Sequence, residues 1–164
     1  MNWQTLSLGL HLGALALWLG GVVFFLVVFG PALEELEPGA AFRVLDHGRR
    51  ALETVAWTGI SLLLITGIVN LILRRQASAS SLGQFYFIAL SIKLIVFGAM
   101  VYHHALQVFK YGPQIAAVTA KTPQETVLEP ATLRLLWQRW FTLLKINATL
   151  GPIATLMGLV LLKS

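Results

Sequence analysis

LHLGALALWLGGVVFFLVVFG, residues 10–30, is a run of apolar side chains in which His11 is the only ionisable residue. A helix that spans a membrane needs roughly 20 consecutive apolar residues, because the hydrocarbon layer is about 30 Å thick. The run therefore predicts a membrane-spanning helix over residues 4–30, ending before Pro31. No Lys or Arg precedes it, and it is too long for the apolar part of a signal peptide, so we expect it to be retained.

Three more segments have the length and the apolar composition of membrane-spanning helices. We expect them at residues 40–73, 82–111 and 132–162. The second should end before Arg74-Arg75, and Gly112-Pro113 should stop the third, because proline disfavours continuation of a helix. The sequence thus predicts one all-α domain over residues 1–164, an integral membrane four-helix bundle with a kink at Gly151-Pro152 in its last helix.

Composition excludes several classes of protein. Of the 164 residues, 57% are hydrophobic and 12% are charged, with a mean hydropathy of +0.76. A soluble domain carries about twice that charged fraction, so the surplus apolar surface is expected to face lipid. The absence of cysteine excludes disulfides, thiolate metal sites and CxxC redox chemistry. The net charge of +5 comes from basic residues beside apolar segments, which is typical of headgroup anchors and not of nucleic-acid binding.

The distribution of basic residues predicts an orientation. With four helices, both termini and the second connection share one side of the membrane, which carries Arg74, Arg75 and Lys163. The other side carries more basic residues, namely Arg43, Arg49, Arg50, Lys110, Lys121, Arg134 and Arg139. The positive-inside rule then places the first and third connections in the cytoplasm, and we expect the membrane to be a bacterial inner membrane.

Small residues indicate where the helices are expected to touch. A stripe on the first helix is formed by Gly9, Gly13, Ala16 and Gly20, and the second helix carries Gly59 and Gly67. Such stripes let two backbones approach closely in lipid. We expect packing between helices there, with room for a flat cofactor as the alternative.

Ionisable side chains inside a bilayer are costly and are therefore candidates for a functional site. The rise of a helix per residue sorts them into two levels. The level nearer the termini holds His11, Lys93 and Met157, and the same depth on the returning helices falls at residues 66–70 and 155–157. The level nearer the first and third connections holds His47, His103, His104, Lys145 and Glu53, with Arg139 at the interface. Because His104 lies roughly 16 Å beyond Lys93, His11 and His104 cannot share one metal ion.

Helical periodicity predicts which of these side chains face inward. Lys93, Met100 and His104 fall within about 40° of one another on the third helix, whereas His103 points about 100° away. On the last helix, a polar stripe that we expect to face a cavity or a site is formed by Gln138, Thr142, Lys145 and Thr149. A mid-helix lysine contributes nothing to packing, which favours a functional role for Lys93. A single intramembrane histidine is about as often a hydrogen bond between helices as a ligand.

Neutral imidazole in an apolar interior is a good ligand for iron or copper, and composition favours haem. Cu(I) usually takes soft sulfur ligands, whereas this chain has three methionines and no cysteine. Haem iron commonly takes two histidines, or a histidine and a methionine, and the candidate ligands here are His11, His47, His104 and Met157. Aromatic residues could supply the flat surfaces that a porphyrin needs, unless they serve instead to anchor the helix ends at the membrane interface. These residues are Trp18, Phe24, Phe25, Trp57, Phe97, Trp137 and Trp140. Cations for its propionates are Arg43, Arg49, Arg50 and Arg139.

Three stretches resemble the CopD-like membrane superfamily: the run that starts at His11, the segment TGIVNL at residues 66–71, and Lys93 followed by Tyr102-His103-His104. That group includes the copper-resistance D domains and HemJ, the haem-binding, oxygen-independent protoporphyrinogen oxidase of bacteria. The oxidase branch implies haem b, a histidine on the first helix and a third helix with a lysine and a YHH-type end. Residues 135–142 are also similar to its last helix, whereas the acidic first connection and TGIVNL are more similar to the copper-resistance domains.

The sequence therefore predicts a haem b protein that transfers electrons, with one haem or with a second haem at the other level. The alternatives are a copper-handling membrane protein, an oxygen-independent protoporphyrinogen oxidase, and a non-catalytic helper in the assembly of a larger complex. Besides the lipid bilayer, the candidate partners are a quinone, a porphyrin and a redox protein. A homo-oligomer is a further alternative. No nucleic acid is expected.

Overall fold

The structure is a computed structural model that describes residues 2–77, 83–121 and 130–163, and every regular element in these ranges is a helix. The elements are α1 (Trp3–Phe24), the π-helix η1 (Phe25–Phe29), α2 (Gly30–Ala32), α3 (Pro38–Ala77), α4 (Gln84–Ala105), the π-helix η2 (Leu106–Tyr111), α5 (Gly112–Lys121) and α6 (Ala131–Lys163). They join into helical rods, and among the described residues four are long and apolar enough to cross a membrane, namely Trp3–Ala32, Pro38–Gln76, Gln84–Lys121 and Ala131–Leu161. The all-α, four-helix prediction is confirmed.

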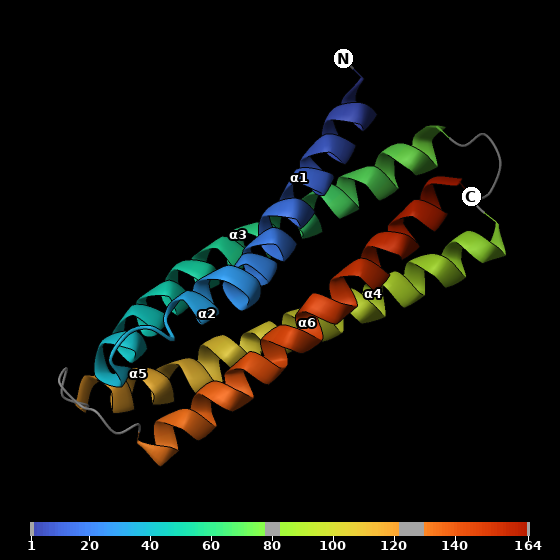
Figure 1. The fold of residues 1–164 in the computed structure, drawn as a ribbon. Coiled ribbons are helices and arrows are strands. Elements are labelled where there is room, and N and C mark those ends of the chain that lie inside the picture. The colour runs from blue at the N-terminus through green and yellow to red at the C-terminus, as the bar shows by residue number, and fades with distance from the viewer. Residues whose placement is uncertain (1, 78–82, 122–129, 164) are drawn as a thin grey trace.

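The bundle consists of two antiparallel pairs, α1 with α3 and α4 with α6 (Figure 1). Both chain ends lie at one end of the bundle, which we call the terminal end. At the opposite end, the loop end, lie α2, the start of α3, α5 and the start of α6. The two pairs contact each other through α1 against α6 and through α5 against α3.

Two contacts define the register of the first pair. A Cβ added to Gly59 would lie 2.9 Å from Cβ of Trp18, and His11 is hydrogen-bonded to Thr66. Seven residues separate the two contacts on each helix, so α1 and α3 run antiparallel with matched rise between them. The expected packing role of Gly59 is confirmed, since only a glycine leaves space for the Trp18 backbone there.

The main core holds the largest buried side chains, Trp18 and Trp140, and it joins the two pairs. Trp18 meets Phe97 edge to face at 6.3 Å, and Phe25 lies 5.3 Å from Trp140. Most of the aromatic residues considered for a porphyrin therefore pack against one another, although Phe24 is exposed. Bulky rings at these positions fix how one pair lies on the other.

The glycine stripe on the first helix does not pack against another helix of this chain. Gly9, Gly13, Ala16 and Gly20 are exposed, and a Cβ added to any of the three glycines would meet nothing within 4 Å. The prediction of helix packing at this stripe is therefore wrong. The larger side chains on the opposite face of α1, Trp18 and Val22 among them, determine which face is buried.

Two expected helix ends are wrong for one physical reason. The helix continues through Gly30-Pro31 and through Gly112-Pro113, and in both places a π-helix comes directly before the Gly-Pro pair. Proline in a helix clashes with the carbonyl four residues earlier, and the wider π turn relieves that clash. The expected third connection is consequently helical as far as Lys121, and residues 122–129 lie outside the described residues.

The second helix also extends past its expected end, through Arg74-Arg75 to Ala77. Arg74 donates a hydrogen bond to the Leu161 carbonyl of α6, and its guanidinium lies 5.0 Å from the centre of the Tyr86 ring of α4. These contacts give the arginine partners inside the bundle, so the charge does not end the helix. Gly151-Pro152 lies within α6.

Candidate functional site

His11 lies on the face of α1 that packs against α3. The helix repeat places Ser7, His11, Ala14 and Trp18 on this one face, and Ser7, Ala14 and Trp18 are buried. His11 is half-buried, and its Nδ1 lies 2.8 Å from Oγ1 of Thr66. A Cβ added to Gly67 would lie 3.6 Å from Cε1 of the His11 ring, so Gly67 faces that edge of the ring.

Lys93 of α4 lies at the same depth in the other helix pair. Its side chain is half-buried beside Gly158 of α6, where an added Cβ would lie 3.2 Å from Nζ. Lys93 and His11 are close enough to interact electrostatically. Among the described residues Lys93 has no hydrogen bond and no carboxylate partner. The predicted level is confirmed, because Thr66 and the neighbourhood of half-buried Met157 are where the rise per residue placed them.

His104 marks the second level, nearer the loop end. It is 4% exposed, its ring lies 5.2 Å from that of Trp57, and Nε2 has no hydrogen-bond partner in the part of the chain that the structure describes. His11 contacts α3 at Thr66, and His104 contacts it at Trp57. These two positions are nine residues, or about 13 Å, apart along the helix, which agrees with the prediction that the two histidines cannot bind one metal ion. Met100 and His104 are both buried as predicted, and His103 is half-buried.

Two buried amides near His104 were not identified from the sequence. Gln107 donates to the Trp140 carbonyl at 3.1 Å, and Asn147 donates to the Met100 carbonyl at 3.2 Å. Both residues are 1% exposed, and their side-chain oxygens have no hydrogen-bond partner among residues 2–77, 83–121 and 130–163. Each amide joins the α4–η2 rod to α6. A single polar residue on an otherwise apolar face was the available signal, since buried amides in lipid commonly bond across helices.

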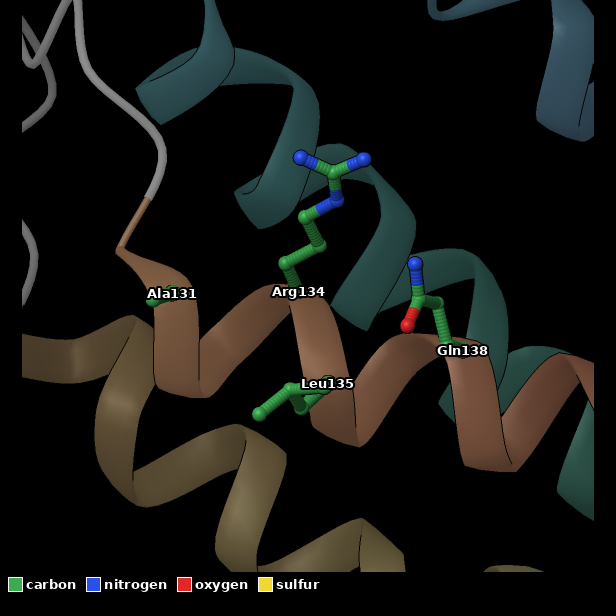
Figure 2. Close-up of a pocket in the computed structure, with 4 residues that line it drawn as sticks. All are labelled: Ala131, Arg134, Leu135 and Gln138. Atoms are coloured by element: carbon green, nitrogen blue, oxygen red, sulfur yellow. The ribbon is translucent and has the colours of Figure 1, made fainter.

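Three of the predicted site residues lie on the outer surface of the chain. His47, Arg139 and Lys145 are exposed. Thr142 and Thr149 are also exposed and donate to carbonyls of their own helix. The stripe was expected to face a cavity or a site, and these three residues, Thr142, Lys145 and Thr149, line no pocket that the structure shows in its described part. Gln138 does border a surface pocket of about 420 Å³ together with Arg134, at the start of α6 (Figure 2).

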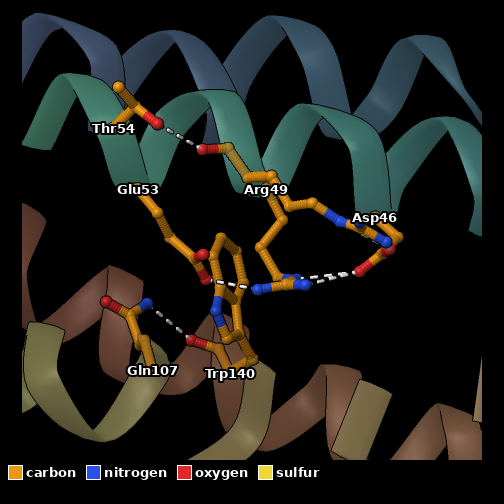
Figure 3. Close-up of polar contacts among 7 residues, drawn as sticks. Asp46, Arg49, Glu53, Thr54, Gln107 and Trp140 are labelled. Atoms are coloured by element: carbon orange, nitrogen blue, oxygen red, sulfur yellow. Dashed lines mark hydrogen bonds and ion pairs between the residues drawn. The ribbon is translucent and has the colours of Figure 1, made fainter. Parts of the chain in front are cut away.

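The arginines near the loop end are held by carboxylates of their own helix (Figure 3). Arg49 is 4% exposed and bonds Asp46 at 2.7 Å and Glu53 at 2.5 Å. The exposed Arg50 bonds the other oxygen of Asp46. Arg49 and Arg50, which were considered as cations for propionates, therefore already have carboxylate partners on their own helix. The spacing of Asp46, Arg49, Arg50 and Glu53 by three or four residues was the signal for this network.

Buried ion pairs of this kind are costly to break, because removal of one partner leaves an uncompensated charge. A Cβ added to Gly112 would lie 2.7 Å from a terminal nitrogen of the Arg49 guanidinium, so the glycine after η2 allows α3 and α5 to approach. Removal of one member of the network should therefore destabilise the loop end of the bundle. The network lies at the opposite end from His11 and Lys93.

The geometry thus contains one level with a histidine and an unpaired lysine, and a second level with an enclosed histidine. Within the described ranges no three His, Cys, Asp or Glu side chains group as metal ligands. Haem iron needs only one or two protein ligands, so such a group is not required for it. No protein-family model, no curated protein and no solved structure matches this chain.

Proposed function

We propose that this chain is an integral membrane protein that binds haem b at the level of His11 and Lys93 and carries electrons. The observation that supports it is the placement of these two ionisable side chains. They come from different helix pairs, lie at one depth in an apolar bundle and interact electrostatically. Placing both ionisable groups inside a membrane costs free energy, so we expect the two residues to have a function.

The residues at this level fit the cofactor. Gly67 faces the His11 ring and Gly158 faces the Lys93 ammonium, so neither position adds a side chain next to these groups. The imidazole of His11 would hold the iron, and the ammonium of Lys93 would offset the negative charge of the porphyrin carboxylates. Bound haem supplies a reversible one-electron couple. The surrounding apolar side chains exclude water, and the resulting low dielectric strengthens the effect of Lys93.

The proposal is limited to one haem. His104 is enclosed by the main core, with Trp57 against its ring, and a porphyrin there would have to displace several packed side chains. The residues present do not fit a porphyrin at that level. His47, which was considered as an iron ligand, is exposed near the loop end.

The proposed haem binding agrees with the resemblance to the haem-binding branch of the CopD-like superfamily. We also propose that the protein lies in a bacterial inner membrane. The first connection and α5 would face the cytoplasm, because basic residues are more frequent at the loop end. An acceptor such as a quinone or a redox protein would take the electron at either surface.

Absorption spectroscopy of the purified protein tests the function. We expect a reduced-minus-oxidised spectrum with Soret and alpha bands and about one iron per chain after expression with ample haem, one iron being the stoichiometry of a single haem site. His11→Ala should lose the haem and keep the bundle, whereas His47→Ala, the matched control at an exposed histidine, should keep it. A colourless wild-type protein would refute the proposal, and copper without porphyrin in the same sample would favour the copper-handling alternative.

A further inference from the structure

Thr66 makes two short contacts through one hydroxyl group. Its Oγ1 lies 2.5 Å from the Leu62 carbonyl oxygen and 2.8 Å from Nδ1 of His11. Two oxygens at 2.5 Å repel each other unless a hydrogen lies between them, and a carbonyl has none to give. The single hydroxyl hydrogen of Thr66 is therefore donated to Leu62, one helical turn earlier.

The bond to Leu62 determines the role of Thr66 toward His11. With its hydrogen already used, Oγ1 can only accept from the histidine, so Nδ1 must carry a hydrogen. A neutral imidazole has one N–H, and in this tautomer Nε2 is left with a free lone pair. Metal-bound histidines commonly donate their other ring N–H to a neighbouring acceptor in this way, which fixes both tautomer and orientation.

We propose that Thr66 is a positioning residue that holds His11 in the tautomer with a bare Nε2, so that the site takes an electron-pair acceptor such as a metal centre. The proposal rests on the proposed function for the identity of the metal group, but the tautomer does not depend on it. A ligand that only accepts hydrogen bonds would find no donor at Nε2.

Neighbouring residues support this assignment. Ser7, one turn from His11 on the same helix face, is 7% exposed, and its hydroxyl has no partner among the described residues, so it does not hold the ring. Gly67 follows Thr66 directly and faces Cε1, the ring atom between the two nitrogens. The first two residues of TGIVNL thus both face one histidine on another helix, and Thr66 is the one that accepts its hydrogen.

Nitrogen NMR of the metal-free protein in lipid tests the tautomer. In ¹⁵N-histidine-labelled protein, with His11 assigned by the signals lost in His11→Gln, we expect a protonated Nδ1 and an unprotonated Nε2. Thr66→Val, which keeps the shape and removes the acceptor, should shift the ring toward the other tautomer, and Thr66→Ser should restore the wild-type pattern. Thr155→Val removes a hydroxyl that bonds the Gly151 carbonyl of its own helix, and it should leave His11 unchanged.

Haem affinity gives the second measurement. Thr66→Val should weaken haem binding by about 10- to 100-fold, the usual effect of removing a partner of a metal-bound histidine, whereas Thr66→Ser and Thr155→Val should bind as the wild type does. Wild-type protein that binds no haem but shows the expected tautomer would refute the proposed function and leave the role of Thr66 intact. A His11 with a bare Nδ1, or a Thr66→Val protein with unchanged tautomer and affinity, would overturn the inference.

Discussion

Lys93, which is half-buried, and Arg49, which is buried, are cations in opposite situations. Arg49 forms ion pairs with two carboxylates of α3, so its charge is compensated within its own helix. Lys93 has no such partner among the described residues and instead shares its surroundings with His11. An uncompensated cation in a low dielectric stabilises a negative or electron-rich neighbour. Lys93 should therefore favour the reduced state of the bound haem.

Replacement of Lys93 by methionine tests this electrostatic role. Loss of a positive charge makes the oxidised iron easier to form, so Lys93→Met should lower the midpoint potential by roughly 50–100 mV, the size of a Coulomb interaction over about 10 Å at an effective dielectric constant near 20. Redox titration of the alpha band measures it. Lys145→Met is the matched control, because Lys145 is exposed on the outer face of α6. An equal shift in both variants would contradict the assignment.

Sequence reasoning located residues well in depth and less well around the helix axis. The contact of His11 with Thr66 and the closeness of Lys93 to Gly158 follow from 1.5 Å of rise per residue, which no partner can change much. Inward orientation was predictable on α4, where Met100 and His104 share a face. It was not predictable for Lys145, because the buried face of α6 is set by Trp137, Trp140 and Leu144, whose packing depends on the other helices.

At the scale of the helices, glycines with a neighbour and glycines without one have different roles. Gly59 touches Trp18 and the Ala14 backbone of α1, whereas Gly20 faces open space. Gly59→Ala should destabilise the α1–α3 pair by about 1–3 kcal/mol, because the added methyl group overpacks a fixed backbone contact. Gly20→Ala should not destabilise the protein by a comparable amount. Thermal unfolding in detergent, followed by tryptophan fluorescence, measures both, and equal stabilities would show that α1 does not lie on α3 as described.

Helix type was predictable from length and composition, but helix ends were not. A Gly-Pro pair ordinarily indicates a helix end, and here η1 and η2 carry the rods past Pro31 and Pro113. Gly112, directly after η2, lies against the guanidinium of Arg49 on α3, which is a contact between distant parts of the chain. Local propensity could not reveal such a contact.

At the scale of the whole molecule, four crossings place both chain ends on one side of the membrane, and the absence of native cysteine makes this directly testable. Single cysteines at Asn2, Glu35 and Gly83, all exposed near helix ends, should react with a membrane-impermeant maleimide. In intact cells Asn2→Cys and Gly83→Cys should be labelled, and Glu35→Cys only after permeabilisation, because Asn2 and Gly83 lie at the terminal end and Glu35 at the loop end. Leu64→Cys, at a side chain that is exposed in the middle of α3, should stay unlabelled on both sides because lipid covers it. Labelling of all three end positions from one side would refute the four-crossing arrangement. The reversed labelling pattern, with only Glu35→Cys labelled in intact cells, would agree with four crossings in the opposite orientation. The loop end and its basic residues would then lie on the outer side, against the positive-inside rule.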